Sequence, residues 1–169
     1  MRHPEHERDY AAQWNDDPAV VAALIDAGAD LHARNDDGRT PLHLAAQQWN
    51  DNVAVVAALL AGGTDLNARD GSGRTPLHEA AVSEDNPAVI AALIDAGADP
   101  DVRADDGAAS LHLAARWNVN PAVVTALLEA GADASLLDGD DETPFDWASA
   151  NEKLKGTHTY RRLRDGRLK

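Results

Sequence analysis

Large apolar residues recur along the chain at a spacing that is typical of an amphipathic helix. Between Val20 and Ile25 they stand at positions i, i+1, i+4 and i+5, which lie on one face of a helix. Gly28 follows, and a glycine at this place ends a helix because it adopts the left-handed conformation readily. The pattern therefore predicts a set of equivalent helices. The copies begin at Val55, Val89 and Val123 and are followed by Gly63, Gly97 and Gly131.

A second motif recurs in register with the first. It reads Thr-Pro-Leu-His-Leu-Ala-Ala from Thr40 and returns from Thr75, Ala109 and, in degraded form, Thr143, in steps of 35, 34 and 34 residues. Thr40 suits the N-cap of a helix, and Pro41 suits the first helical position, where its missing N–H costs nothing. Two motifs in one frame identify an internal repeat, and the repeat decides the architecture.

Each repeat is predicted to form a helix, a turn, a second helix and a hairpin loop. The second helices begin with a capping residue and a proline, at residues 17–18, 86–87 and 120–121, and the hairpins contain glycine-centred turns such as Asp36-Asp37-Gly38. The fold class is therefore all-α, a solenoid of stacked helix-turn-helix units with hairpin loops. We expect one domain over residues 1–169, with repeats at about 5–33, 34–68, 69–102, 103–136 and 137–169.

These residues resemble the ankyrin repeat, whose hallmark is Thr-Pro-Leu-His followed by a second helix and Gly-Ala-Asp, and the resemblance is to ankyrin proteins of bacterial type. The family's usual period is 33 residues, whereas here the turn between the helices is one or two residues longer. The first repeat lacks Thr-Pro-Leu-His, and the fifth has Asp146 in place of the histidine and Asp141 in place of the hairpin glycine. Both ends are therefore interpreted as capping repeats. Residues 157–165 are expected to form the last helix, with Tyr160 and Leu163 covering the fourth repeat.

Charge and composition exclude several classes of protein. The chain carries −14 at neutral pH, which disfavours binding to nucleic acid or to an anionic membrane. Residues 151–169 are basic, at +5, so the first 150 residues carry −19. There is no cysteine, and no apolar run approaches the ~20 residues of a membrane span. No signal peptide is visible, so we expect a cytoplasmic location, although secretion without a signal would leave no trace in the sequence.

Candidate chemistry is confined to residues that recur with the repeat. His43, His78 and His112 occupy one motif position. The resemblance implies that this histidine bonds to the backbone of the adjacent repeat. Neighbouring repeats stand roughly 10 Å apart, which is too far for shared metal ligation. We predict no metal site and no cofactor.

The candidate carboxylates also recur with the repeat. An aspartate follows each helix-ending glycine, where its side chain can cap free N–H groups. We expect a catalytic acid–base pair to break the repeat pattern, and identify no carboxylate that does so, which predicts that the protein is not an enzyme. The capping aspartates are Asp30, Asp65, Asp99 and Asp133.

The resemblance implies a binding surface made of hairpin tips and exposed positions of the first helices, which line a concave groove in the family. These positions differ between repeats while the framework does not, as a specific binding surface requires. The candidate partner-binding residues are Asp36, Asp37, Arg39, Gln47, Gln48, Ser72, Arg74, Val82, Ser83, Asp105, Asp106, Arg116 and Trp117.

Two further rows of residues have alternative interpretations. Trp14, Trp49 and Trp117 each lie 14 residues before the helix-ending glycine. They form either an aromatic edge for a partner or, as we favour, a cover for the lengthened turn. Three arginines on the hairpins stand near aspartates, and pairing along the surface is the default interpretation. These arginines are Arg34, Arg69 and Arg103, near Asp36, Asp70 and Asp105.

The sequence therefore predicts a monomeric module that binds another protein, with a basic partner surface expected from the acidic charge. It predicts no nucleic-acid or membrane partner. Two functions remain open: a general adaptor or scaffold, and a dedicated inhibitor, such as an immunity protein or antitoxin, that blocks a basic toxin or enzyme.

Overall fold

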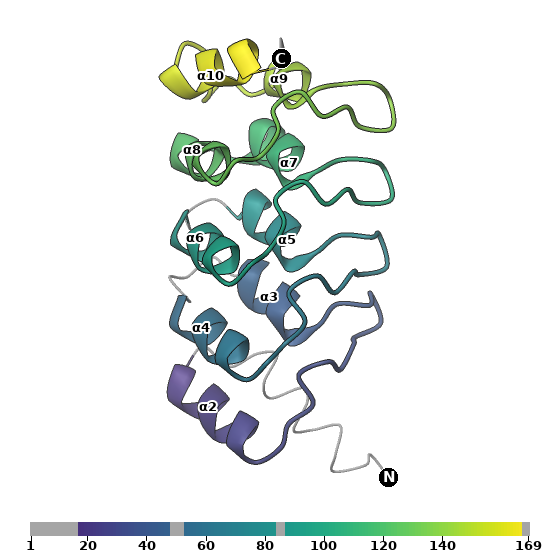
Figure 1. Cartoon of the computed structure of the whole chain (residues 1–169), viewed down its shortest axis with the longest axis vertical. Helices are drawn as coiled ribbons and strands as arrows, with labels where there is room; N and C mark the ends of the chain where they lie inside the picture. The colour runs from purple at the N-terminus through teal and green to yellow at the C-terminus, as the bar shows by residue number, and fades with distance from the viewer. Residues whose placement is uncertain (1–16, 48–52, 84–86, 167–169) are drawn as a thin grey trace.

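The computed structural model describes residues 17–47, 53–83 and 87–166. Within these ranges the regular elements are all helices, and they stand in two columns (Figure 1). The column of second helices contains α2 (Pro18–Asp26), α4 (Val53–Ala61), α6 (Pro87–Asp95), α8 (Pro121–Glu129) and α10 (His158–Gly166). The column of first helices contains α3 (Pro41–Gln47), α5 (Pro76–Val82), α7 (Ser110–Trp117) and α9 (Pro144–Ala148).

Each helix contacts the equivalent helix of the next repeat. Thus α3 packs on α5, α5 on α7 and α7 on α9, while α2, α4, α6 and α8 form the parallel series. The loops between repeats project from the first-helix column, on the side away from the second helices (Figure 1). The predicted all-α solenoid with hairpin loops is confirmed.

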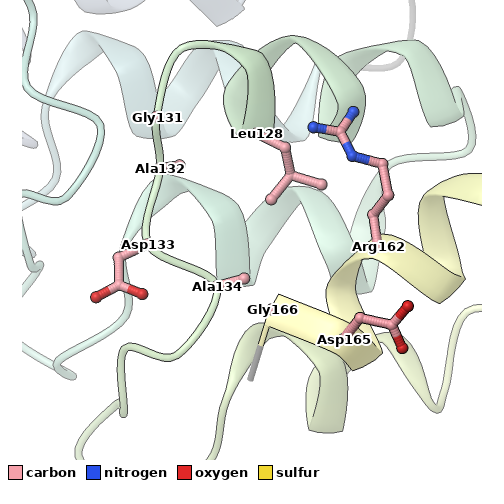
Figure 2. Close-up of a pocket in the computed structure, with 8 residues that line it drawn as sticks. All are labelled: Leu128, Gly131, Ala132, Asp133, Ala134, Arg162, Asp165 and Gly166. Carbon is pink, nitrogen blue, oxygen red and sulfur yellow. The ribbon is translucent and has the colours of Figure 1, made fainter. Parts of the chain in front are cut away.

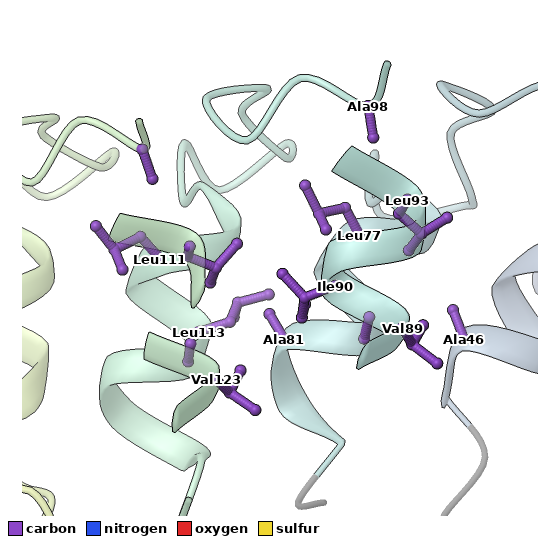
Figure 3. Close-up of a cluster of buried hydrophobic side chains, with 14 of the residues drawn as sticks. Ala46, Leu77, Ala81, Val89, Ile90, Leu93, Ala98, Leu111, Leu113 and Val123 are labelled. Carbon is purple, nitrogen blue, oxygen red and sulfur yellow. The ribbon is translucent and has the colours of Figure 1, made fainter. Parts of the chain in front are cut away.

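The core is a continuous aliphatic layer between the two columns. The leucine of the Thr-Pro-Leu-His motif is buried in three repeats, at Leu42, Leu77 and Leu111. It packs with the apolar stripe of the second helices, which in α6 includes Ile90 and Leu93 (Figure 3). The alanine pair that ends the motif is also buried, and its small side chains let neighbouring first helices approach closely.

The ends of the second helices form as their sequences predict. The side chains of Asp17 and Asn120 accept hydrogen bonds from the N–H groups of Ala19 and Ala122, at 2.9 and 3.0 Å, and so cap α2 and α8. The helix-ending glycines have φ angles between +82° and +103°. A Cβ atom would meet nothing within 4 Å at any of them, so it is the left-handed backbone that requires glycine here. These residues are Gly28, Gly63, Gly97 and Gly131.

Backbone hydrogen bonds join each hairpin to the next. The N–H of Gly71 donates to the carbonyl of Asp37 at 2.8 Å, and the N–H of Gly139 donates to the carbonyl of Asp106 at 2.9 Å. In the fifth hairpin Asp141 takes the place of glycine with φ +61°, a conformation that aspartate tolerates better than most residues.

The last helix closes the C-terminal end of the described chain. It packs on α8 and α9, with Leu163 fully buried and Tyr160 partly buried against the core. The Tyr160 ring lies against Phe145, with ring centroids 4.9 Å apart. The expected docking of residues 157–165 is thus confirmed. None of the described helices is long and apolar enough to cross a membrane.

Candidate protein-binding face

The motif histidines connect neighbouring repeats. In His43 and His78, Nδ1 accepts a hydrogen bond from the backbone N–H three residues earlier, at 3.1 Å, so the proton resides on Nε2. Nε2 then donates to a carbonyl of the next hairpin, that of Arg74 at 3.0 Å and that of Ala108 at 3.2 Å. His112 makes the equivalent contacts. Burial lowers the pKa of all three side chains, to about 4 for His78, so they are neutral structural groups at neutral pH.

The recurring aspartates cap their loops as predicted. Each accepts a hydrogen bond from the N–H two residues further on, at 2.8 to 2.9 Å. Within the described ranges, no group of three or more His, Cys, Asp or Glu residues could hold a metal ion. The four aspartates are Asp30, Asp65, Asp99 and Asp133.

The hairpin arginines bond mainly to backbone carbonyls of their own and of the next hairpin. Arg34 donates to the carbonyl of Gly38 at 2.7 Å and to that of Arg69, in the next hairpin, at 2.5 Å. Arg69 in turn reaches the carbonyl of Arg103 at 3.0 Å and the carboxylate of Asp105 at 3.1 Å. Pairing along the surface is thus confirmed for Arg69, whose partner Asp105 lies in the next hairpin, whereas Arg34 and Arg103 donate to backbone carbonyls. The stacked hairpins turn backbone carbonyls toward the preceding guanidinium group, and these carbonyls need a donor.

The hairpin tips carry the most accessible of the predicted binding residues. Asp36, Asp37 and Ser72 are exposed and line an open depression of about 660 Å³ between the second and third hairpins. The side chains of Asp36 and Asp37 make no hydrogen bond or ion pair to any described residue. Asp105 is exposed but paired with an arginine, and Asp106 accepts a hydrogen bond from the N–H of residue 108 at 3.0 Å.

The predicted residues in and beside α3 and α5 are less accessible than the hairpin tips. Arg39 and Gln47 are half-buried and bond to each other at 3.0 Å, and Val82 is half-buried against the core. Ser83 has a relative exposure of 5%, so its side chain does not lie on the surface. The reason is that the turn of the next repeat covers it, where an asparagine side chain donates to the Ser83 carbonyl. Gln48 lies outside the described residues.

An aromatic cluster lies at the end of α7. Trp117 has a relative exposure of 56%, large for this side chain. The guanidinium carbon of Arg116 lies 4.8 Å from the Trp117 ring centroid and 5.4 Å from that of Trp147. Trp147 is fixed by a 2.7 Å hydrogen bond from its Nε1 to Asp138. Trp117 is thus a surface residue rather than a cover for the turn, whereas the predicted equivalents at positions 14 and 49 lie outside the described residues.

One residue in the centre of this face escaped the sequence reasoning. The expectation that no carboxylate breaks the repeat pattern is wrong, because Glu79 occupies the place of Leu44 and Leu113 and has a relative exposure of 1%. Arg39 Nη2 lies 3.5 Å from Glu79 Oε1, and the charges of Arg39 and Arg74 both favour the ionised form of Glu79. Burial nevertheless raises the pKa of Glu79 above its usual value. The available signal was the charged residue within His-Glu-Ala-Ala, where the second and fourth repeats have leucine.

A second depression, of about 480 Å³, lies beside α10, near the C-terminal end of the described chain (Figure 2). It separates the loop after α8 from α10, and its lining includes Leu128, Asp133, Arg162 and Asp165. Arg162 also lies 3.8 Å from Glu129 of α8. This depression belongs to the contact between the last two second helices and contains none of the predicted binding residues.

Stacked helix pairs with a constant core and a variable outer face define a helical repeat protein of the binding type. A family model of three ankyrin repeats matches residues 9–104. The chain therefore belongs to the ankyrin-repeat family, whose members are generally protein–protein interaction modules and are typically not enzymes. Among curated proteins, none matches this chain.

Proposed function

We propose that this protein binds another protein through its hairpin face, defined as the hairpin loops together with α3, α5 and α7. The observation that carries the proposal is the contrast between a repeated framework and a varied surface. The motif leucines, histidines and glycines hold equivalent places, whereas the exposed hairpin turns carry Asp36 and Asp37 in one repeat and Gly71 and Ser72 in the next. The following repeat has Asp105 and Asp106 in its turn and adds the exposed Trp117 at the end of α7. Such a surface presents different groups at regular intervals to one extended partner.

The charge of the chain supports a basic partner. The net charge is −14, and Asp36 and Asp37 are exposed carboxylates without a counter-ion among the described residues. Exposed charges of this kind accelerate encounter and determine specificity more than they add affinity. We further propose that the protein acts as a monomer, which sedimentation at the working concentration tests.

A dedicated inhibitor, such as an immunity protein or antitoxin, is the second candidate function. The −19 charge of the first 150 residues favours it, because an acidic face can occlude a basic active site. The two candidates differ in their effect on the isolated partner. An inhibitor abolishes the partner's own activity at stoichiometric concentration, whereas an adaptor leaves that activity unchanged.

Binding kinetics with the partner isolated by affinity capture test the charged part of the face. The variant Asp36→Asn with Asp37→Asn should slow association several-fold at low salt and flatten its salt dependence. The matched control is Asp26→Asn with Asp95→Asn, which removes the same charge from exposed positions at the ends of α2 and α6. If the two variants slow association equally, only net charge matters and the hairpin face is not the binding surface.

Trp117 tests the apolar part of the face. Trp117→Ala should speed dissociation by roughly tenfold or more, because removing a hot-spot aromatic costs about 2 kcal/mol or more. Val20→Ala, at an exposed position of α2 with a relative exposure of 39%, is the control and should leave dissociation unchanged. Equal dissociation rates for Trp117→Ala and the unmodified protein, with both folded by circular dichroism, would rule out Trp117 as an anchor.

A further inference from the structure

Glu79 places an ionisable group where the repeat calls for a leucine. Its side chain is almost entirely buried, at 1% relative exposure, between α3 and α7 in the middle of the first-helix column. Burying a carboxylate in place of an aliphatic side chain is unfavourable unless a counter-ion and hydrogen bonds compensate for the lost hydration. The environment of Glu79 therefore determines whether it is charged.

Arg39 is the cation closest to Glu79, and it reaches across a repeat boundary. The Arg39 backbone belongs to the hairpin of the second repeat, and its guanidinium group lies between two carboxylates of the third repeat. Its Nη2 atom is 3.5 Å from Glu79 Oε1, and its Nε atom is 3.6 Å from Asp70 Oδ2. Its shortest contact is the 3.0 Å hydrogen bond from Nη1 to Gln47. The Nε atom is buried and makes no hydrogen bond. Arg39 is thus held near the carboxylates mainly by charge attraction, because neither contact has short hydrogen-bond geometry.

The charged groups around Glu79 do not bring its pKa back to the ordinary value. Arg74, from the third hairpin, favours the ionised form together with Arg39, while Asp70 disfavours it. Burial outweighs these charges, so the pKa of Glu79 is raised. Asp70 behaves in the opposite way: despite burial, hydrogen bonds from the N–H groups of Arg74 and Ser72 hold its pKa below the usual value. On acidification, Glu79 therefore loses its charge before Asp70 does.

The other elements packed against α5 supply no further counter-ion. On α3, His43 is kept neutral because burial lowers its pKa. On α7, His112 is engaged with a backbone carbonyl and Arg116 lies against tryptophan rings. On α6, the charged residue is Asp95, which is exposed at the last position of the helix.

We propose that Arg39 and Glu79 form a pH-dependent latch across the second and third repeats. While Glu79 is ionised, Arg39 stays folded onto α5. When Glu79 takes up a proton from solvent, its attraction to Arg39 is lost, and the guanidinium group is left with its contacts to Asp70 and Gln47. The latch needs no partner, so its test stands apart from that of the proposed function.

A double-mutant cycle at two pH values tests the latch. The Glu79 side-chain carboxyl carbon is first followed by NMR to find its titration midpoint. The unfolding equilibrium constants of the unmodified protein, Arg39→Ala, Glu79→Gln and the double variant are then measured on either side of that midpoint. Above it, we expect the two residues to be coupled by about threefold or more in the unfolding constant, and below it the coupling should vanish.

Two further measurements keep the outcome decisive. The NMR signal of the Arg39 Nε–H group should show greater side-chain mobility below the Glu79 midpoint, while the mobility of Arg103 should not change. A purely structural contact would leave the mobility of Arg39 the same at both pH values. Glu79→Leu restores the repeat pattern and replaces Glu79→Gln if the amide variant does not fold. The exposed Arg69–Asp105 pair, cycled with Arg69→Ala and Asp105→Asn, controls for general surface charge. Coupling that is equal on both sides of the midpoint, or absent above it, overturns the latch.

Discussion

At the scale of single residues, the histidine of the repeat motif serves two neighbours at once. Its Nδ1 accepts from the start of its own helix and its Nε2 donates to the next hairpin. In the fifth repeat Asp146 takes the place of the histidine and makes the first of these contacts, accepting from Thr143 N at 2.9 Å. The structural role of the histidines could be predicted because it follows from their motif position. The burial of Glu79 and Ser83 could not, because it depends on which side chains of the next repeat cover them.

The buried histidines should make the protein less stable in mild acid. The pKa of His78 is about 4 in the folded protein against 6.5 unfolded, so the unfolded chain binds the proton more readily. Stability is therefore complete above pH 6.5 and falls as the pH drops toward 4, by on the order of 3 kcal/mol for this residue. Glu79 contributes the opposite slope, because its folded pKa is raised.

Urea denaturation between pH 7 and 4.5 isolates the His78 contribution. His78→Gln should be less stable than the unmodified protein at pH 7, and the difference should shrink as the pH falls. His32→Gln, which removes an exposed loop histidine outside the repeat motif, is the control for the substitution itself. A His78→Gln difference that stays constant across this range would contradict the neutral, buried assignment of the ring.

At the scale of the elements, asparagine side chains fix the lengthened turns between helices. Asn118 follows α7, is fully buried, and donates from Nδ2 to the carbonyls of Ala81 at 3.1 Å and Ser83 at 2.7 Å. Asn151 repeats the arrangement one repeat later. The sequence pattern assigns the lengthened turn to the tryptophan before Asn118, but the asparagine side chain makes the hydrogen bonds that hold the turn. Its recurrence after tryptophan at positions 15, 50 and 118 was the available signal.

Removing this side chain should therefore weaken the contact between the third and fourth repeats. Asn118→Ala leaves two buried carbonyls without their donor and should cost about 1–3 kcal/mol in the free energy of unfolding. Val119→Ala, at the neighbouring exposed position, should change it by no more than ~0.5 kcal/mol. Chemical denaturation of both variants provides the measurement. Equal stability of the two would show that the turn does not depend on the amide.

At the scale of the whole molecule, stability is expected to be a sum of contacts between neighbouring repeats. The stacking order and the docking of the last helix could be predicted from the two motifs, since each pair of helices has an apolar side that only the next pair can cover. The positions of side chains on the hairpin face could be predicted less well. There the contacts join different repeats, as in the bond from Arg69 to the Arg103 carbonyl.

The last helix should be essential to the stack. Ending the chain after Asn151 uncovers Leu127 and Leu128 of α8, and we expect aggregation in light scattering. Leu163→Ala retains the helix and should cost roughly 2–5 kcal/mol. Arg161→Ala, at an exposed position of the same helix, is the control and should have little effect. A truncated chain that remains monomeric with an unchanged melting temperature would show that α10 is dispensable.

The central claim is that the hairpin face binds a partner protein, and hydrogen exchange of the chain with and without its captured partner tests it most directly. We expect partner-dependent protection in the hairpins at residues 34–39, 69–74 and 103–108 and around Trp117, with α4, α6 and α8 unchanged. Because these segments alternate along the sequence, the footprint should repeat with the period of the chain. Protection confined to the second-helix column or to α10, with the hairpins unchanged, would contradict the account.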